Sequence, residues 1–386
     1  MKEFIPLSAP YVHGNEKESL IECIDSGWVS TVGPYVDEFE KDFAKVLGAN
    51  YAVAMNSGTS ALHIALLVSG VRKGMEVIIP SVTFIAPANA ISYVGAVPVF
   101  CDIELNTLQI CPASVRLFIE ESCDFINGKL INRKSGRQVF AILPIDHLGH
   151  PFCVDEILEI ARKFNLKIIE DASESLGAKY KGANVGLFGD ISCFSFNGNK
   201  IITCGGGGML VTNDKECAER ARYLSTQAKD DPYEYFHENI GYNYRLTSIQ
   251  AAFGRAQLSN LKKCIKKKRE IAKVYKNAFS GINGLTFISE NENSYSNYWM
   301  QVILINEEVL SLNSRELAKK LEEERIQTRP IWQPLSLTGA HKNNCVSLTM
   351  PNAMIAYKRG ICLPSSHSLT EEQQEKVIDC IIKFIK

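Results

Sequence analysis

Short, almost wholly apolar runs alternate with helix-length amphipathic stretches over roughly the first two hundred residues. The apolar runs fall at residues 51–55, 76–80, 97–101, 138–144, 167–171, 190–196 and 207–212, and helical patterns at 60–69, 87–94 and 154–164 separate several of them. Strands that are apolar on both faces and joined by helices are typical of a parallel sheet covered on both sides. We therefore expect an α/β domain.

The second half of the chain has a different pattern. A long helical stretch spans about residues 245–279. It is followed by a strand-like run at 298–305, a helix at 314–324 and a C-terminal helix at 371–385, which predict a smaller α+β unit. We expect a large domain over residues 1–260, including the N-terminal segment, and a small C-terminal domain over residues 261–386.

Charge and composition argue against several classes of protein. The chain has 42 Lys and Arg against 43 Asp and Glu, so nucleic acid or an anionic membrane is not expected as the main partner. No apolar run is long enough to cross a bilayer, and the N-terminus lacks a signal-peptide pattern. The twelve cysteines are scattered without a Cys-x-x-Cys pair, which favours a reducing compartment and predicts no metal site. We expect a cytoplasmic protein.

The segment 56–61 ends a predicted strand and opens a predicted helix. Free N–H groups and the helix dipole at such a junction bind phosphate well, and Gly58 lets the backbone approach a ligand closely. Thr59 adds a hydroxyl donor. An ordinary Ser or Thr helix cap explains the same residues equally well. The segment has no Gly-Lys-Ser/Thr sequence, so it does not support a P-loop NTPase.

Three further polar segments follow apolar runs. Asp171 ends the run at 167–171, at the sheet edge where open α/β folds bind ligands, although a turn cap is the commoner role for such a residue. Lys200 lies in a glycine-bounded loop before four consecutive glycines, and a desolvated lysine amine is a nucleophile toward carbonyl carbons. The segment 241–247 leads into the long helix and by itself predicts only a helix start with Thr247 near the cap.

Together, these segments provide the groups that one cofactor requires. A phosphate cradle, a carboxylate and a reactive lysine are what pyridoxal 5′-phosphate (PLP) requires. The lysine holds the aldehyde as an imine, the carboxylate keeps the ring nitrogen protonated, and the cradle anchors the phosphate. Each signal is weak alone, but the combination predicts a PLP-dependent enzyme.

The chain also resembles the DegT/DnrJ/StrS sugar aminotransferases over nearly its whole length. The segment around Lys200 carries the likeness, together with residues 26–34, 57–63, 80–84, 170–172, 242–247 and 328–330. The resemblance implies PLP fold type I, the aspartate aminotransferase-like fold. This fold has a large domain with a mostly parallel seven-stranded sheet and a smaller C-terminal α+β domain.

The resemblance also implies roles for residues near the cofactor. Lys200 would form the imine with PLP, Asp171 would pair with the pyridine nitrogen, and Phe84 would stack on the ring. Glu174 falls where the family usually has Gln or His beside the ring oxygen of the cofactor. The phosphate would be held by Gly58, Thr59 and Ser195.

Two further sets of contacts follow from the resemblance. Asn243 would reach the phosphate in the neighbouring subunit's site, which makes a homodimer with shared active sites the expected unit. Six positions are candidates for sugar-nucleotide contacts by their place in similar proteins: Trp28, Ser30, Thr31, Arg329, Trp332 and Gln333. The Arg329 guanidinium suits a phosphate and a structural ion pair equally well.

Many relatives have His-Pro shortly before the lysine, whereas this chain has Asn197-Gly198-Asn199. This variant, the segment 146–150 and a polar surface insertion at 121–137 look most like the LegC-like branch. Members of that branch aminate UDP-4-keto-6-deoxy-N-acetylhexosamines on the way to bacillosamine- or legionaminic-type sugars of surface glycans. The expected reaction is a ping-pong transamination from L-glutamate, with Lys200 as general base and acid.

Two alternatives remain open. Some relatives are PLP-dependent sugar dehydratases, but those closest in chemistry have histidine in place of the lysine, so Lys200 argues against this activity. The second alternative is a non-catalytic, cofactor-binding regulator. The joint presence of Lys200, Asp171 and the phosphate cradle argues against it.

Overall fold

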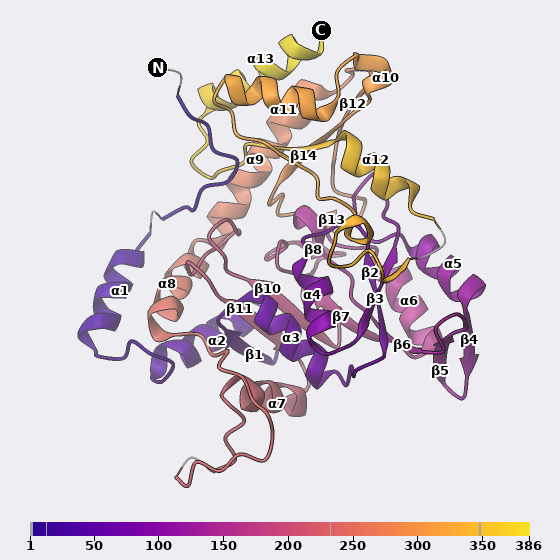
Figure 1. The fold of residues 1–386 in the computed structure, drawn as a ribbon. Helices are drawn as coiled ribbons and strands as arrows, with labels where there is room; N and C mark the ends of the chain where they lie inside the picture. Colours follow the sequence, from indigo (N-terminus) through magenta and orange to yellow (C-terminus); the bar gives the residue numbers. More distant parts are fainter. Residues whose placement is uncertain (1–2, 13, 232, 347–348) are drawn as a thin grey trace.

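The computed structural model describes residues 3–12, 14–231, 233–346 and 349–386 (Figure 1). A ten-stranded sheet lies at its centre, and eight of its strands follow the order β1-β11-β10-β7-β6-β2-β3-β16. The seven expected strands form the continuous part of this sheet: β1 (Tyr51–Met55), β2 (Glu76–Pro80), β3 (Val97–Cys101), β6 (Gln138–Ile142), β7 (Lys167–Asp171), β10 (Ile191–Ser195) and β11 (Gly208–Thr212). All neighbours in this run pair in parallel except β11, which is antiparallel to both β1 and β10.

Three strands extend the sheet beyond the expected seven. The predicted insertion at 121–137 folds as a hairpin of β4 (Cys123–Ile126) and β5 (Lys129–Asn132), and β5 pairs with β6. Asn127 and Gly128 have positive φ values of 51° and 75° in the hairpin turn, a conformation that Asn and Gly adopt readily. Strand β16 (Cys345–Val346) pairs in parallel with β3.

Helices cover both faces of this sheet because alternate strand residues are buried on opposite sides. Val53 and Leu210 pack in one core with α3 (Gly58–Val68), α4 (Ala86–Tyr93) and α7 (Lys215–Ser225). The opposite face packs against the remaining helices of this layer, which are α2 (Pro34–Leu47), α5 (Pro112–Ser122), α6 (Val154–Phe164) and α8 (Ser248–Ser259). α1 (Glu16–Asp25) lies against α8.

The helix expected at 245–279 is wrong as a single element. Thr247 forms a capping box with Gln250, so α8 begins at Ser248. Asn260 ends α8 and precedes α9 (Leu261–Phe279). Asn is a poor residue for a helix interior because its side chain competes for backbone groups, and Asn260 Nδ2 donates to the carbonyl of Ala256 at 3.5 Å.

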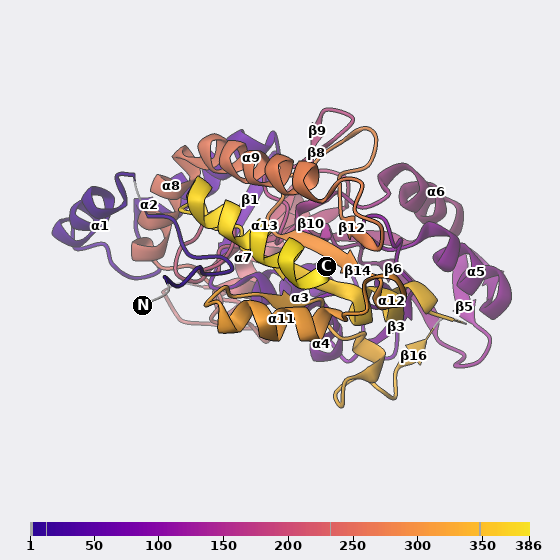
Figure 2. The same cartoon turned by 90° about the horizontal axis from the view of Figure 1, so that it is seen from above.

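A second, four-stranded antiparallel sheet has the order β12-β14-β17-β15 and lies above the first in Figure 1. Its strands are β12 (Leu285–Phe287), β14 (Gln301–Ile305), β15 (Arg329–Pro330) and β17 (Gly360–Leu363). Viewed from above, α9, α11 (Ser314–Glu323) and α13 (Glu371–Ile385) run across it (Figure 2). Ile5 belongs to the same core, so the first described residues pack on this sheet.

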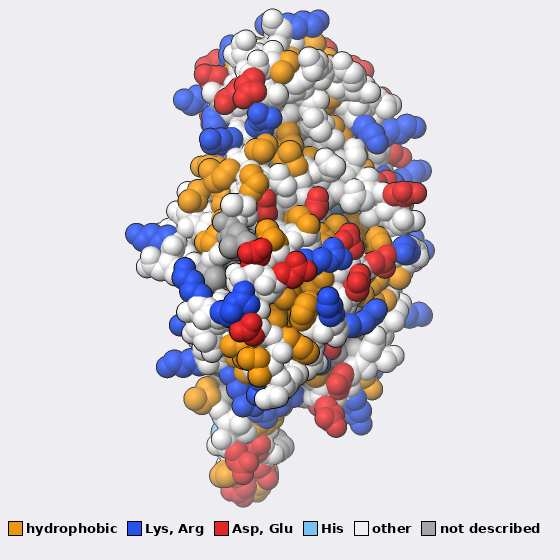
Figure 3. All heavy atoms as spheres, turned by 90° about the vertical axis from the view of Figure 1, so that its right-hand side faces the viewer, with side chains coloured by type: hydrophobic (Ala, Val, Ile, Leu, Met, Phe, Trp, Pro, Cys, Tyr) orange, Lys and Arg blue, Asp and Glu red, His pale blue; other side chains and the backbone are white. Residues whose placement is uncertain are grey.

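The remaining elements are short. β8 (Lys179–Tyr180), β9 (Ala183–Asn184) and β13 (Ser294–Tyr295) form a small third sheet, and α10 (Glu307–Leu310), α12 (Pro351–Arg359) and the 3₁₀ turns His147–Gly149 and Leu335–Leu337 complete the fold. The face that carries α5, α6 and the β4–β5 hairpin has intermixed acidic and basic side chains (Figure 3). In the described part of the chain, no helix has the length and apolarity needed to span a bilayer.

Candidate active site

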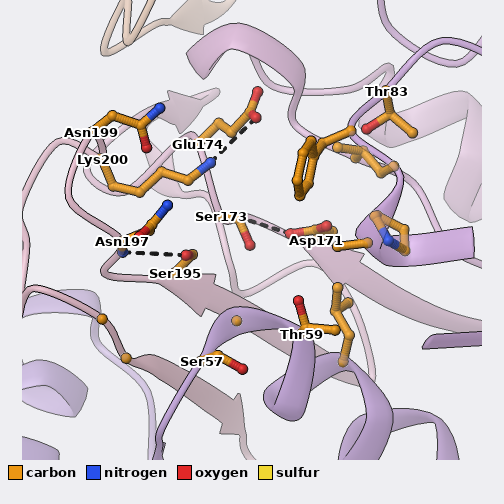
Figure 4. A pocket seen from close by; sticks show the side chains of 18 of the residues that line it. Ser57, Thr59, Thr83, Asp171, Ser173, Glu174, Ser195, Asn197, Asn199 and Lys200 are labelled. Carbon is orange, nitrogen blue, oxygen red and sulfur yellow. Dashed lines mark hydrogen bonds and ion pairs between the residues drawn. The ribbon is translucent and has the colours of Figure 1, made fainter. Parts of the chain in front are cut away.

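A pocket of about 330 Å³ lies where β7 and β10 end and α3 begins. Figure 4 shows Lys200, Glu174, Asp171, Ser195 and Thr59 around it, although they come from different elements. Seven of the eight residues expected at the cofactor line this pocket: Gly58, Thr59, Phe84, Asp171, Glu174, Ser195 and Lys200. The structure therefore brings together residues that are up to 142 positions apart in the sequence.

The segment predicted to hold a phosphate forms the N-terminus of α3. Ser57 is its N-cap, and Ser57 Oγ accepts a hydrogen bond from the Ser60 amide at 3.0 Å. The first turn of a helix has N–H groups without an intrahelical acceptor, which attract an anion. A Cβ atom on Gly58 would lie 2.8 Å from Cβ of Ser195, so glycine is needed for this close approach. The helix start and the Ser195 hydroxyl thus face the same space.

The carboxylate of Asp171 lies at the carboxyl end of β7. Its side chain accepts a hydrogen bond from the Ser173 amide at 3.0 Å, and the residue is only 5% exposed. Burial raises the pKa of Asp171 to about 6. A buried carboxylate of this kind is stabilised by a cation. The protonated nitrogen of a pyridine ring in the pocket would supply that cation.

Lys200 lies in the loop after β10, and its side chain is 12% exposed. Its Nζ lies 3.3 Å from Glu174 Oε1 and 4.2 Å from the centre of the Trp299 ring. Glu174 Oε2 accepts a hydrogen bond from the Leu148 amide at 2.7 Å. The amine therefore lies between a fixed carboxylate and an aromatic face, inside the pocket.

Among the pocket residues that were not predicted from the sequence, three lie next to Lys200 in space or in the chain: Trp299, Asn197 and Asn199. Trp299 follows Lys200 by 99 positions and precedes a strand, where an aromatic residue is usually part of the core. Asn197 and Asn199 also line the pocket. The sequence showed that Asn197-Gly198-Asn199 replaces the His-Pro of many relatives before Lys200, but it did not predict a role for either asparagine.

The other predicted residues lie in different places. Trp332 lines the pocket, whereas Asn243 is exposed and its carbonyl accepts a hydrogen bond from Asn56 Nδ2 at 3.2 Å. Arg329 lines a separate surface groove with Arg315 and Arg325. The main pocket is not lined by the remaining four candidates, which are Trp28, Ser30, Thr31 and Gln333. Three of them are exposed: Trp28, Ser30 and Gln333. The carbonyls of Ser30 and Thr31 accept hydrogen bonds from Ser248 and Arg245, near the start of α8.

These residues fit PLP. The helix start suits its phosphate, Asp171 its ring nitrogen and Lys200 its aldehyde, and all three line one pocket. Within the described ranges, no group of three or more His, Cys, Asp or Glu side chains is arranged to hold a metal ion.

Comparisons with known proteins agree with this chemistry. The chain is 40% identical to GDP-perosamine synthase of Escherichia coli O157:H7 over 99% of both chains. It is 36% identical to GDP-perosamine synthase of Caulobacter vibrioides, over 97% of this chain and 96% of that protein. The structure of DesV from S. venezuelae, solved with a ketimine intermediate, superposes with a TM-score of 0.85 at 29% identity, over 96% of this chain and 94% of that one.

The sequence profile of the DegT/DnrJ/EryC1/StrS aminotransferase family matches residues 10–382. The family match covers all three sheets and every residue of the pocket. The chain belongs to this family and is a PLP-dependent sugar aminotransferase with fold type I.

Proposed function

We propose that this enzyme transfers the amino group of L-glutamate to C4 of a nucleotide-linked 4-keto-6-deoxy sugar. The observation that carries the proposal is the position of Lys200 Nζ in one pocket with Asp171 and the start of α3. Bound PLP would supply an electron sink for the carbanion that forms when a proton leaves the donor.

Lys200 is the proton carrier in this proposal. Its Nζ accepts the proton from Cα of the donor and later returns a proton to C4 of the sugar. Glu174 Oε1, at 3.3 Å from Nζ, is placed to stabilise the ammonium form between these two events. Asp171 would keep the ring nitrogen of the cofactor protonated throughout, because the two groups form an ion pair.

Two nucleotides are candidates. The Asn197-Gly198-Asn199 variant and the LegC-like features of the sequence support a UDP-linked N-acetylhexosamine, for bacillosamine- or legionaminic-type products. The two relatives named GDP-perosamine synthase support a GDP-linked sugar instead. Trp332 lines the pocket and is the substrate candidate with the best support from the geometry.

A substrate screen tests the proposal. UDP-, GDP- and dTDP-linked 4-keto-6-deoxy sugars are each incubated with the PLP-loaded enzyme and L-glutamate, and products are identified by mass spectrometry and NMR. A 4-amino product with any one of them supports the proposal and identifies the nucleotide. Amination at C3, or no amination of any sugar, contradicts it. Lys200→Ala should abolish both turnover and the visible absorption of the bound cofactor, whereas Lys215→Ala, on the exposed face of α7, should change neither.

We also propose that the enzyme is a cytoplasmic homodimer in which Asn243 acts in the partner's site. Each chain would consist of a large domain, residues 1–260, and a small domain, residues 261–386. Asn243 is exposed and does not line the pocket of its own chain, which supports this assignment. Mixed dimers of Lys200→Ala and Asn243→Ala chains test it. Such a dimer has one site with both residues intact only if the two subunits share their sites, so activity should recover to as much as half. No recovery on mixing contradicts the assignment.

A further inference from the structure

The amine of Lys200 has an aromatic contact that its expected role does not require. The Trp299 ring centre lies 4.2 Å from Nζ, on a residue that precedes β14 of the second sheet. We propose that Trp299 is a positioning residue that holds Lys200 Nζ beside Glu174 through a cation–π contact. This inference rests on the role proposed above for Lys200.

The indole contacts the lysine loop at two points. Besides the ring contact with Nζ, Trp299 Nε1 donates a hydrogen bond to the carbonyl of Asn199 at 2.6 Å, and Asn199 directly precedes Lys200. The Trp299 residue is only 2% exposed. A cation–π contact shielded from water in this way is stronger than one on the surface.

The backbone of Trp299 is fixed by a buried lysine. Lys268 of α9 donates hydrogen bonds from Nζ to the Trp299 carbonyl at 2.9 Å and to Ser365 Oγ at 3.3 Å. The Lys268 residue is 1% exposed, and burial lowers its pKa to about 7. Burying an amine costs free energy, and here the amine ties α9 and the segment after β17 to the residue that contacts Lys200.

A single asparagine fixes both neighbours of the Lys200 amine. Asn297 Oδ1 accepts a hydrogen bond from the Trp299 amide at 2.8 Å, and Asn297 Nδ2 donates to the Glu174 carbonyl at 2.9 Å. Tyr298, between Asn297 and Trp299, has a φ of 48°, which is unfavourable for an aromatic residue. Such strain persists where the surroundings hold it in place, often at functional sites. The Asn297 side chain thus sets the distance between Glu174 and Trp299.

The test measures how fast the Lys200 amine reacts in the cofactor-free protein. Wild-type and variant proteins are acetylated at pH 7.5 with an N-hydroxysuccinimide ester, and the modification of Lys200 is followed by peptide mass spectrometry. The exposed Lys215 on α7 is the internal reference. Trp299→Leu removes the ring, so its Lys200 should be acetylated about tenfold to thirtyfold faster than Lys200 of the wild type, as expected from the loss of a cation–π contact that is shielded from water.

Two variants separate the contact from mere opening of the pocket. Trp299→Phe retains an aromatic face, so the acetylation rate of its Lys200 should stay within about twofold of the wild-type rate. Trp332→Leu opens the same pocket without removing the ring near Nζ, so its Lys200 should also react at the wild-type rate. Equal rates in Trp299→Leu and Trp332→Leu, or an unchanged rate in Trp299→Leu, would overturn the inference. Far-UV circular dichroism confirms that each variant is folded before labelling.

The loaded enzyme provides a second measurement. If Trp299 positions Lys200, Trp299→Leu should lower kcat with little change in KM for glutamate, and Trp299→Phe should restore most of kcat. A rise in KM alone would show that Trp299 binds substrate and would overturn the positioning role. The labelling experiment does not need the aminotransferase reaction. A failed sugar screen with the expected labelling pattern would therefore reject the proposed function and leave the Trp299 contact established.

Discussion

Replacing Asp171 by Asn should stabilise the cofactor-free protein near neutral pH and abolish its activity. Burial raises the pKa of Asp171 from 3.8 to about 6, so ionisation is harder in the folded than in the unfolded chain. This difference between the folded and unfolded pKa values lowers the unfolding free energy of the wild type by about 3 kcal/mol. The cost is fully present above pH 6, where the folded protein contains a buried carboxylate. It disappears as the pH falls from 6 to 3.8, where the folded chain holds the proton.

Urea unfolding of the cofactor-free proteins at pH 8 and pH 5 measures this effect. Asn retains the oxygen that accepts the Ser173 amide, so the substitution removes mainly the charge. We expect the Asn variant to exceed wild type by about 3 kcal/mol at pH 8 and by about half as much at pH 5. The same variant should bind PLP weakly and lack transaminase activity, because the ring nitrogen loses its anionic partner.

Asp155→Asn is a matched control. Hydrogen bonds from Lys181 and Tyr180 lower the pKa of Asp155, so removing this exposed carboxylate should give no gain in stability at pH 8. If Asp171→Asn is no more stable than wild type at pH 8, the Asp171 carboxylate is already compensated in the cofactor-free protein. In that case the need for a cationic ligand, on which the fit to PLP partly rests, is refuted.

Three other substitutions give separate tests. Gly58→Ala would place a methyl group 2.8 Å from Cβ of Ser195, so we expect about 1–3 kcal/mol of destabilisation in urea and weaker PLP binding; unchanged PLP affinity would contradict the cradle. Gly149→Ala, at a φ of 93° and with the new Cβ 2.7 Å from the Trp299 amide, should lower Tm and speed acetylation of Lys200. Lys268→Met removes an amine whose pKa burial lowers from 10.5 to about 7. Between these two pKa values Lys268 is protonated in the unfolded chain and neutral in the folded chain. The unfolding free energy of the wild type should therefore rise relative to that of the variant between pH 7 and 10. Equal pH dependence of the two proteins in urea unfolding would contradict this.

The large sheet was predictable because its strands are buried on both faces. Residues 51–55 and 76–80 are apolar nearly throughout and match β1 and β2 residue for residue. The break at Asn260 was not predicted, because the apolar and basic pattern continues through it and only local hydrogen bonds end α8 there. β16 has only two residues, too few for any periodicity to show.

The positions of Gly58, Thr59 and Asp171 at the sheet edge were predictable because each lies at or just after the end of a strand that could be read from the sequence. A side chain that reaches the pocket from a distant segment gives no such signal. Trp299 occupies what looks like the start of an apolar strand, and its function depends on a ring placed against Lys200 by contacts with Lys268 and Asn297. The sequence gives no sign that Lys268 is buried either, because it lies in a lysine-rich helix in which Lys262, Lys263 and Lys266 are exposed.

The surroundings of Lys200 come from both sheets. Asp171 ends β7 of the large sheet and α3 packs on that sheet, whereas Trp299 lies just before β14 of the second sheet and is held by Lys268 of α9. Both Asp171 and Lys268 are ionisable groups whose burial reduces stability, since burial shifts each pKa toward the neutral form. A cationic ring bound in the pocket would offset the cost at Asp171, whereas Lys268 does not line the pocket, so a ligand there would not offset its cost. If the buried Lys268 amine fixes the position of the Trp299 ring, Lys268→Met should change the rate at which Lys200 is acetylated, and an unchanged rate refutes this argument.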